Sequence, residues 1–274
     1  MSGPRQIRLL LADVDGTLVT NDKVLTEESK AAARELQSAG IALAITSSRP
    51  PRGLRMLIEP LALCSAIAGC NGGVFVNPDL SVIETHALDP ATARQTVTLL
   101  LDQGLDVWVY TADEWLVRDR KAPRVAREEG TLQFAPRIVA SFTDADLTQV
   151  VKIAGVSDDF DRVAACEQSA QSALGARASA ARSQLYFLDV THPLANKGAV
   201  AAALSKRLNI PSEQIATIGD MPNDVLMFRK SGLSIAMGNA SDAVKAQASV
   251  VTDSNGNEGF AKAVRKFILR TSAA

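Results

Sequence analysis

The N-terminal sequence Ile7-Arg8-Leu9-Leu10-Leu11-Ala12-Asp13-Val14-Asp15-Gly16-Thr17-Leu18 changes from apolar to acidic at a single point. The nearly all-apolar run up to Ala12 is typical of a strand that is buried on both faces of a parallel sheet. Residues two apart on an extended chain share a face, so Asp13 and Asp15 should both point into the crevice at the carboxyl edge of the sheet. Gly16 lets the chain turn sharply directly after them. These residues predict an α/β sheet with two carboxylates at its ligand-binding edge.

The flanking sequence continues this alternation of strands and helices. Thr26 is a good N-cap for a helix that Gly40 ends, and the apolar run 41–45 follows as a second strand. A strand, a helix and a strand joined by short links form a parallel pair with a right-handed crossover. The pattern returns near the C-terminus, with strands expected at 215–218, 234–236 and 250–251 and helices at 199–208, 223–231, 241–247 and 258–269.

The middle of the chain has a different pattern, which indicates an inserted α+β domain. Asp89 and Pro90 begin a helix that runs to about residue 103, and the runs 105–110 and 115–118 flank a short polar turn, as in a hairpin. Further strands are expected at 150–156 and 185–190 and a helix at 158–174, whereas the alanine-rich stretch 173–181 is expected to be a helix end and loop. We therefore predict a Rossmann-like open parallel sheet from residues 1–85 and 188–274, with an α+β insert at residues 86–187.

Composition narrows the class of protein. The 274 residues, of which 47% are hydrophobic, suffice for two domains, and a net charge of -1 argues against a nucleic-acid partner. Cys64, Cys70 and Cys166 are odd in number and fit no zinc motif, which favours reduced thiols. The first apolar run is too short for a signal peptide or a membrane span. We expect a cytoplasmic protein without a membrane partner; the sequence leaves the oligomeric state open.

A second acidic pair, Asp220 and Asp224, directly follows the strand expected at 215–218. Four carboxylates around one crevice repel one another, and a hard dication such as Mg²⁺ relieves this with oxygen ligands. Lys197 adds a positive charge, and Ser47 and Ser48 add hydroxyl and N–H donors after the second strand. Carboxylates, metal, ammonium and hydroxyl together form a site for phosphoryl transfer. Each signal alone fits a turn, a helix end or a solvated side chain; their order along the chain favours a site.

In these motifs the chain resembles the haloacid-dehalogenase superfamily, specifically its Cof-like subfamily with a type IIB cap. The resemblance spans nearly the whole chain, and it is carried by four segments: Leu10 to Leu18, Ile218-Gly219-Asp220-Met221-Pro222-Asn223-Asp224, Ile235-Ala236-Met237-Gly238-Asn239-Ala240 and Asn255-Gly256-Asn257-Glu258-Gly259. It implies a phosphatase whose insert is a cap that reads the leaving group. The motifs are specific for the family and much less so for a substrate.

The resemblance also implies roles for individual residues. Asp13 is the expected nucleophile, and Asp15 the expected acid and later base. The carboxylates of Asp13 and Asp220 and the backbone carbonyl of Asp15 are the expected Mg²⁺ ligands. Lys197 is expected to bind the phosphoryl oxygens, with Asp224 orienting it.

Further positions are implied at the substrate. Asn223 is expected to support the metal and substrate, and Asn71 to face the cap. The family usually has Thr-Gly-Arg where this chain has Ser47-Ser48-Arg49, so Ser47 would be the phosphate donor, and Ser48 and Arg49 would lie beside substrate. Ser48 costs strain if the position needs a positive φ. Thr46 is the alternative donor if the register differs by one.

Two other groups of residues have a structural and a functional interpretation. The first comprises the cap residues Trp108, Tyr110, Trp115 and Arg118. Packing within the cap is the favoured interpretation for its aromatics, with one or two able to face substrate. His86 and His192 are interpreted as hinge or surface residues.

Three functions fit the sequence. The first is a Mg²⁺-dependent phosphatase of small phosphorylated metabolites, chiefly sugar phosphates, that works through an aspartyl-phosphate. A phosphomutase on the same scaffold is the second, and a non-catalytic ligand-binding or regulatory protein is the third. The complete set of Asp13, Asp15, Lys197 and Asp220 favours an enzyme, because a binding protein gains nothing from crowded acids.

Overall fold

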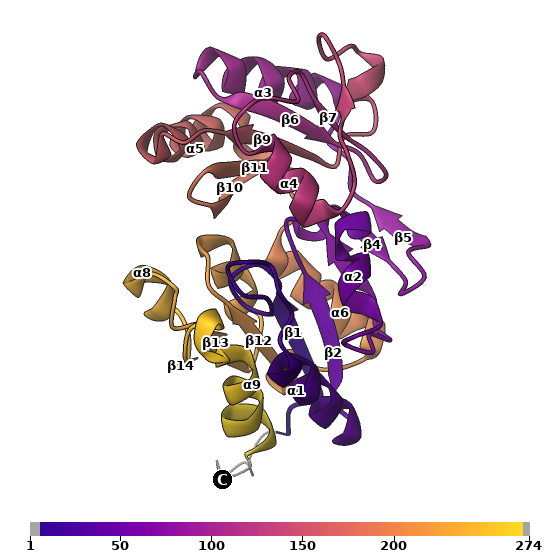
Figure 1. The fold of residues 1–274 in the computed structure, drawn as a ribbon, viewed down its shortest axis with the longest axis vertical. Helices are drawn as coiled ribbons and strands as arrows, with labels where there is room; N and C mark the ends of the chain where they lie inside the picture. Colours follow the sequence, from indigo (N-terminus) through magenta and orange to yellow (C-terminus); the bar gives the residue numbers. More distant parts are fainter. Residues whose placement is uncertain (1–5, 271–274) are drawn as a thin grey trace.

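The computed structural model describes residues 6–270, which form two lobes stacked along the long axis of the molecule (Figure 1). The core lobe has an eight-stranded sheet of order β14-β13-β12-β1-β2-β3-β4-β5, and the cap lobe, from α3 to β11, has a six-stranded sheet of order β10-β11-β9-β6-β7-β8. The strands are β1 (Leu9–Asp13), β2 (Ala42–Thr46), β3 (Ile67–Gly69), β4 (Val74–Val76), β5 (Val82–Thr85), β6 (Asp106–Tyr110), β7 (Trp115–Val117), β8 (Arg137–Ile138), β9 (Lys152–Val156), β10 (Ser179–Gln184), β11 (Phe187–Thr191), β12 (Ile215–Gly219), β13 (Leu233–Ala236) and β14 (Val250–Val251). The helices are α1 (Glu27–Ser38), α2 (Arg55–Ile58), α3 (Pro90–Asp102), α4 (Val125–Leu132), α5 (Phe160–Leu174), α6 (Lys197–Leu208), α7 (Val225–Phe228), α8 (Asp242–Lys245) and α9 (Gly259–Ala263).

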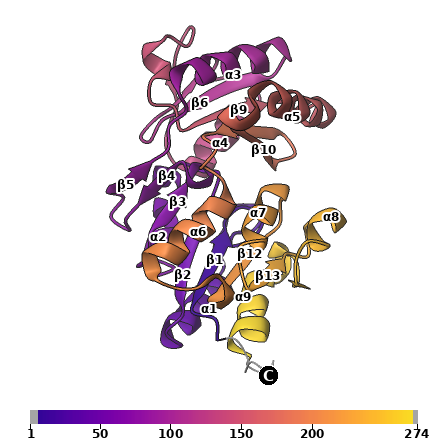
Figure 2. The ribbon, with the colours of Figure 1, turned by 180° about the vertical axis from the view of Figure 1, so that it is seen from behind.

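The alternation of side chains along β1 places the first acid on a defined face of the core sheet. Leu10 and Ala12 pack with α1 and α9, and Leu9 and Leu11 pack with α6 and α7 on the opposite face (Figures 1 and 2). Asp13 continues the second series, because side chains alternate with a period of two. The first acid therefore lies on the side of α6, which begins at Lys197.

The predicted α/β fold class is confirmed. Strands β14, β13, β12, β1, β2 and β3 are parallel, and Thr26 caps α1 by accepting a hydrogen bond from Ser29 N. Strands β4 and β5 add an antiparallel edge that the sequence did not reveal. The helix expected at 223–231 is shorter than predicted, since α7 ends at Phe228.

The cap sheet buries both of its faces. Helices α3 and α5 cover one face, and the other carries Trp108, Tyr110 and Trp115, which are fully buried against one another. The predicted packing role of these aromatics agrees with this arrangement, and Arg118 is exposed. Helix α4 lies on the same side, between the two lobes (Figure 1).

Two sequence expectations differ from the structure in the cap. The alanine-rich stretch expected to be loop contains β10, because pairing with β11 outweighs the low strand propensity of small residues. The predicted border after residue 187 falls at the start of β11, which pairs with β9 and β10, so the chain leaves the cap sheet after Thr191.

The chain crosses between the lobes twice, and one histidine lies at each crossing. His86 follows β5 and His192 follows β11, and their rings stack at 5.6 Å. This placement agrees with their interpretation as hinge residues.

Cys64, Cys70 and Cys166 are free, and Cys70 and Cys166 are buried. Within residues 6–270, no helix is both long and apolar enough to cross a membrane.

Candidate active site

Lys197 lies at the centre of the site, with a carboxylate on each side. Its Nζ donates to Asp13 Oδ1 at 2.5 Å and to Asp224 Oδ1 at 2.6 Å, and all three side chains are buried. Burial alone lowers the pKa of a lysine, but here the charges of Asp13 and Asp224 outweigh burial and raise it. Lys197 is thus a permanent cation that holds two acids from distant parts of the chain.

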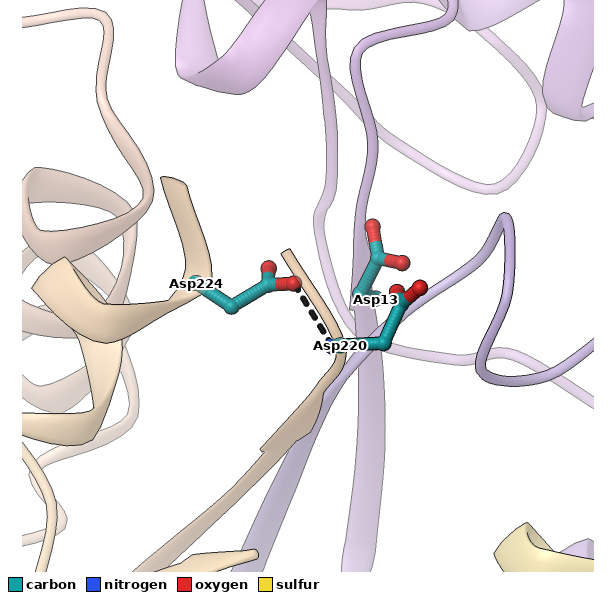
Figure 3. Close-up of side chains that lie close together, drawn as sticks. All are labelled: Asp13, Asp220 and Asp224. Carbon is teal, nitrogen blue, oxygen red and sulfur yellow. Dashed lines mark hydrogen bonds between the residues drawn. The ribbon is translucent and has the colours of Figure 1, made fainter. Parts of the chain in front are cut away.

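Asp13, Asp220 and Asp224 form a buried acidic triad whose nearest oxygens all lie within 4.8 Å of one another (Figure 3). Burial, with the charge of Asp224, raises the pKa of Asp13 to about 7 despite Lys197. Burial and the charge of Asp13 raise the pKa of Asp220 well above its ordinary value. Both shifts reflect carboxylates that are buried close to one another, and a dication relieves such a condition.

The oxygens of Asp224 are already engaged. Its Oδ2 accepts hydrogen bonds from Asp220 N and Met221 N, each at 2.9 Å, while Oδ1 accepts from Lys197. Asp224 therefore positions Lys197 and the loop, which leaves Asp13 and Asp220 to supply carboxylate oxygens for a cation. This donor set fits Mg²⁺, which takes one or two carboxylates.

Glycines allow the close approach of these acids. Gly16 has a φ of +86°, and a Cβ there would lie 2.3 Å from Asp220 Oδ2. At Gly219 a Cβ would lie 2.4 Å from Asp224 Cγ. A side chain at either position would push the triad apart.

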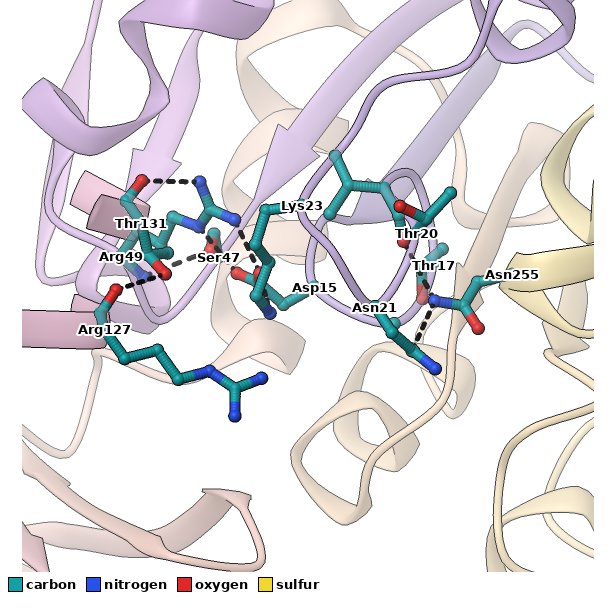
Figure 4. Close-up of polar contacts among 12 residues, drawn as sticks. Asp15, Thr17, Thr20, Asn21, Lys23, Ser47, Arg49, Arg127, Thr131 and Asn255 are labelled. Carbon is teal, nitrogen blue, oxygen red and sulfur yellow. Dashed lines mark hydrogen bonds and ion pairs between the residues drawn. The ribbon is translucent and has the colours of Figure 1, made fainter. Parts of the chain in front are cut away.

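Asp15 has two cationic partners. Arg49 donates from Nε at 2.7 Å and from a terminal nitrogen at 2.6 Å, and Lys23 donates at 2.7 Å (Figure 4). Burial opposes ionisation, but the charge and hydrogen bonds of Arg49, together with Lys23, outweigh it and lower the pKa of Asp15. Asp15 is therefore held as a carboxylate. The remaining donor group of Arg49 contacts the carbonyls of Gly53 and Thr131, so Arg49 also joins the two lobes.

The loop after β2 lies beside Asp13, because Asp13 and Thr46 are register partners. Ser47 Oγ accepts a hydrogen bond from Arg49 N at 3.1 Å, which leaves its own proton free to donate. Ser48 has no positive φ, so the strain considered for a residue in place of glycine does not arise. Thr46 Oγ1 is buried without a hydrogen-bond partner.

Asn71 and Asn223 contact each other beside the boundary between the lobes. Asn223 Nδ2 donates to Asn71 Oδ1 at 3.2 Å, and Asn71 Nδ2 donates to Asp189 Oδ2 at 3.1 Å. Asp189 lies on β11, next to the second crossing. The amide of Asn71, expected to face the cap, thus joins the Asp220 loop to the cap sheet.

The C-terminal motifs fix the loop that follows β1. Asn239 Nδ2 donates to Gly16 O and to Asp220 Oδ2, and Asn255 Nδ2 donates to Val19 O and Asn21 Oδ1 (Figure 4). Their role is to hold the acidic turn in place.

Three contacts at the site were missed by sequence reasoning. Lys23 and Thr17 contact Asp15 and Asp220 respectively, and no sequence signal marks Lys23. Lys152, in contrast, interrupts the apolar run 150–156, and a lone lysine in a buried strand is a signal of a polar partner. That lysine lies in the interface between the lobes.

An acidic crevice at the carboxyl edge of a parallel sheet, closed by an inserted lobe, is the architecture of a phosphoryl-transfer hydrolase. The chain belongs to the family of haloacid dehalogenase-like hydrolases, whose pattern it matches over residues 10–264. The family predicted from the sequence is thereby confirmed.

Individual relatives agree with this assignment. The chain is 26% identical, over 96% of each chain, to a 5-amino-6-(5-phospho-D-ribitylamino)uracil phosphatase of Bacillus subtilis. It is similar, with 26% identity and a TM-score of 0.81, to the crystal structure of a haloacid dehalogenase-like hydrolase from Bacteroides thetaiotaomicron, covering 95% of this chain and 99% of that one. A subclass IIB sugar phosphatase shares the fold, with a TM-score of 0.83 at 21% identity and coverage of 95% and 98%. The predicted enzyme class, a phosphoric monoester hydrolase, agrees with these findings.

Proposed function

We propose that this protein is a Mg²⁺-dependent phosphatase of small phosphorylated metabolites, of the sugar-phosphate class, which acts through an aspartyl-phosphate on Asp13. The observation that carries the proposal is the buried contact of Lys197 with both Asp13 and Asp224. A lysine with its charge fixed between two acids is suited to neutralise phosphoryl oxygens beside a carboxylate nucleophile.

The residues that would hold Mg²⁺ are Asp13, Asp220 and the backbone carbonyl of Asp15. When bound, the cation would offset the charge of the crowded acids and of the phosphoryl group. Asp224 would keep Lys197 in position rather than bind the metal, because its oxygens are already used.

Two proton transfers complete the reaction. In the first step Asp13 forms a bond to phosphorus, the bond to the ester oxygen breaks, and that oxygen takes a proton from Asp15. In the second step Asp15 takes a proton from water, which attacks phosphorus and releases Asp13. The ion pairs seen here suit the second step, since they favour the carboxylate. The first step requires at least one of the two cations on Asp15 to move when substrate binds.

Replacement of the nucleophile tests the proposal. We expect Asp13→Asn to lower kcat for phosphate release by roughly 10⁴-fold or more, since the amide cannot form the intermediate. Asp22→Asn, an exposed change in the same loop, should leave kcat unchanged. Chelation of Mg²⁺ should abolish release by the wild-type protein, and full activity of Asp13→Asn would overturn the mechanism.

The same assay separates the alternatives. A mutase forms an isomeric sugar phosphate without releasing phosphate. A non-catalytic protein binds esters and converts none. Phosphate release that matches substrate loss supports the phosphatase.

A further inference from the structure

A small cavity between the lobes lies directly beside Asp15. Its volume is about 20 Å³, and its core wall includes Asp15, Lys23 and Arg49. Helix α4 and strands β9 to β11 supply the cap wall. A leaving group attached to a phosphoryl group near Asp13 would extend past Asp15 toward this wall once the cap opens to admit it.

The lining of this cavity has more positive than negative side chains. Its acids are Asp15 and Glu128, and its five cations are Lys23, Arg49, Arg124, Arg127 and Lys152. Burial raises the pKa of Glu128 despite the nearby Lys152. Excess positive charge around a small space between the lobes favours an anionic ligand.

Four of the five cations already have partners in the closed site. Lys23 and Arg49 pair with Asp15, Lys152 donates to the carbonyl of Ser48, and Arg124 pairs with exposed Asp158. Within residues 6–270 these contacts leave one lining cation, Arg127, without a polar partner for its guanidinium.

Arg127, on α4, pairs with no carboxylate within residues 6–270; its only close charged or aromatic contact there is the Tyr186 ring, 5.9 Å away. Figure 4 shows its side chain extending from the helix, away from the carbonyl that it offers to Thr131. Arg124 lies one turn earlier, with its guanidinium 3.7 Å over the same ring. Its backbone φ of 69° is unfavourable for a residue with a side chain. Strained residues of this kind are concentrated at ligand-binding sites.

We propose that the substrate is a phosphate monoester whose leaving group carries a second anionic group, and that Arg127, assisted by Arg124, binds that group at the cap wall. The inference rests on the proposed phosphatase function and narrows its substrate class. A carboxylate and a second phosphate both match a guanidinium, which binds planar or multidentate anions through paired hydrogen bonds. The face of Tyr186 is already covered by Arg124, so stacking of a flat neutral ring is the less favoured use of this wall.

Matched substrates test the proposal and distinguish the two anions. Glucose 6-phosphate and 6-phosphogluconate differ by a carboxylate, whereas fructose 6-phosphate and fructose 1,6-bisphosphate differ by a phosphate. With the full chain and Mg²⁺, we expect kcat/KM for the anionic member of at least one pair to be about tenfold higher, mainly through KM, as for one charge-assisted contact. In Arg127→Gln that ratio should fall toward one, and in Arg127→Lys it should be intermediate.

The control is Arg120→Gln, which removes the same charge from an exposed cap arginine that pairs with half-buried Glu129 outside the cavity. It should leave the ratio as in the wild type. Equal kcat/KM within both pairs, or a preference that persists in Arg127→Gln, would overturn this inference while leaving the phosphatase intact. Failure to release phosphate from every ester, p-nitrophenyl phosphate included, would overturn both.

Discussion

Lys152 Nζ, on cap strand β9, donates a hydrogen bond of 2.8 Å to the backbone carbonyl of Ser48, in the loop after core strand β2. The same ammonium lies 3.5 Å from Asp189 Oδ1 and 4.1 Å from the centre of the Tyr110 ring. One buried cation of the cap thus fixes the loop that carries Ser47. The closed arrangement of the two lobes depends in part on this contact.

Lys152→Met should therefore destabilise the protein by about 2–4 kcal/mol, because it leaves the Asp189 carboxylate buried without a countercharge. Lys152→Met with Asp189→Asn should recover part of this loss, since the buried charge is then removed as well. Urea unfolding measures both effects, with exposed Lys121→Met as the control. If Lys152→Met had the same free energy of unfolding as the wild type, the contact would make no net contribution to stability.

Gly16 and Gly40 form a matched pair for testing the acidic turn. Both have positive φ, +86° and +70°, but only Gly16 would bring a Cβ against Asp220; nothing lies within 4 Å of a Cβ at Gly40. Each change to alanine should cost roughly 1 kcal/mol of stability from the backbone. Only Gly16→Ala should also raise the Mg²⁺ concentration for half-maximal activity, by roughly tenfold. Equal Mg²⁺ dependence in the two variants would contradict the crowding seen at Asp220.

Metal binding should stabilise the wild-type protein measurably. A ligand at one hundred times its Kd contributes about 2.7 kcal/mol, so saturating Mg²⁺ should raise Tm and chelation should reverse the rise. Asp220→Asn should lose this response. Without Mg²⁺, however, it should be at least as stable as the wild type, because it relieves repulsion among buried acids. Calorimetry measures Tm with and without Mg²⁺ and so checks both expected changes in Tm. Exposed Asp242→Asn is the control.

The convergence of Asp13, Lys197, Asp220 and Asp224 was predictable because each follows a buried strand or begins a helix, and parallel strands bring these ends to one edge. The contacts that loops make could not be predicted in this way. Arg49 was expected beside substrate, but its pair with Asp15 was not predicted, since the path of the intervening loops has no periodic signal. Strand β10 was missed for a related reason, because its pairing partner, and not its own residues, determines its conformation.

The histidine pair at the crossings predicts a pH dependence of stability. Burial and the charge of His86 lower the pKa of His192 below its ordinary value of 6.5, against the opposing effect of Asp89; Glu84 pairs with His86. The unfolded chain then binds the proton on this imidazole more readily, so the contribution of His192 to stability should be constant well above pH 6.5 and should fall as pH drops through that value. Tm measured from pH 8 to 5 should show this loss, and His192→Gln should reduce it. An identical pH profile in the variant would contradict the assignment to His192.

The last test decides which hydroxyl donates to the phosphoryl group. The Ser47 hydroxyl oxygen accepts a hydrogen bond from Arg49 N, so its own proton is available to donate. Thr46 Oγ1, in contrast, is buried and has no hydrogen-bond partner. Thr46→Val removes an unsatisfied polar atom at nearly constant shape, so it should be neutral or slightly stabilising and should leave kcat/KM unchanged. Ser47→Ala should lower kcat/KM by roughly 100-fold, as for one lost donor to developing charge. If steady-state kinetics instead showed a loss of kcat/KM in Thr46→Val and none in Ser47→Ala, Thr46 would be the donor. The phosphoryl group would then lie beside the last residue of β2 rather than beside the loop that follows it.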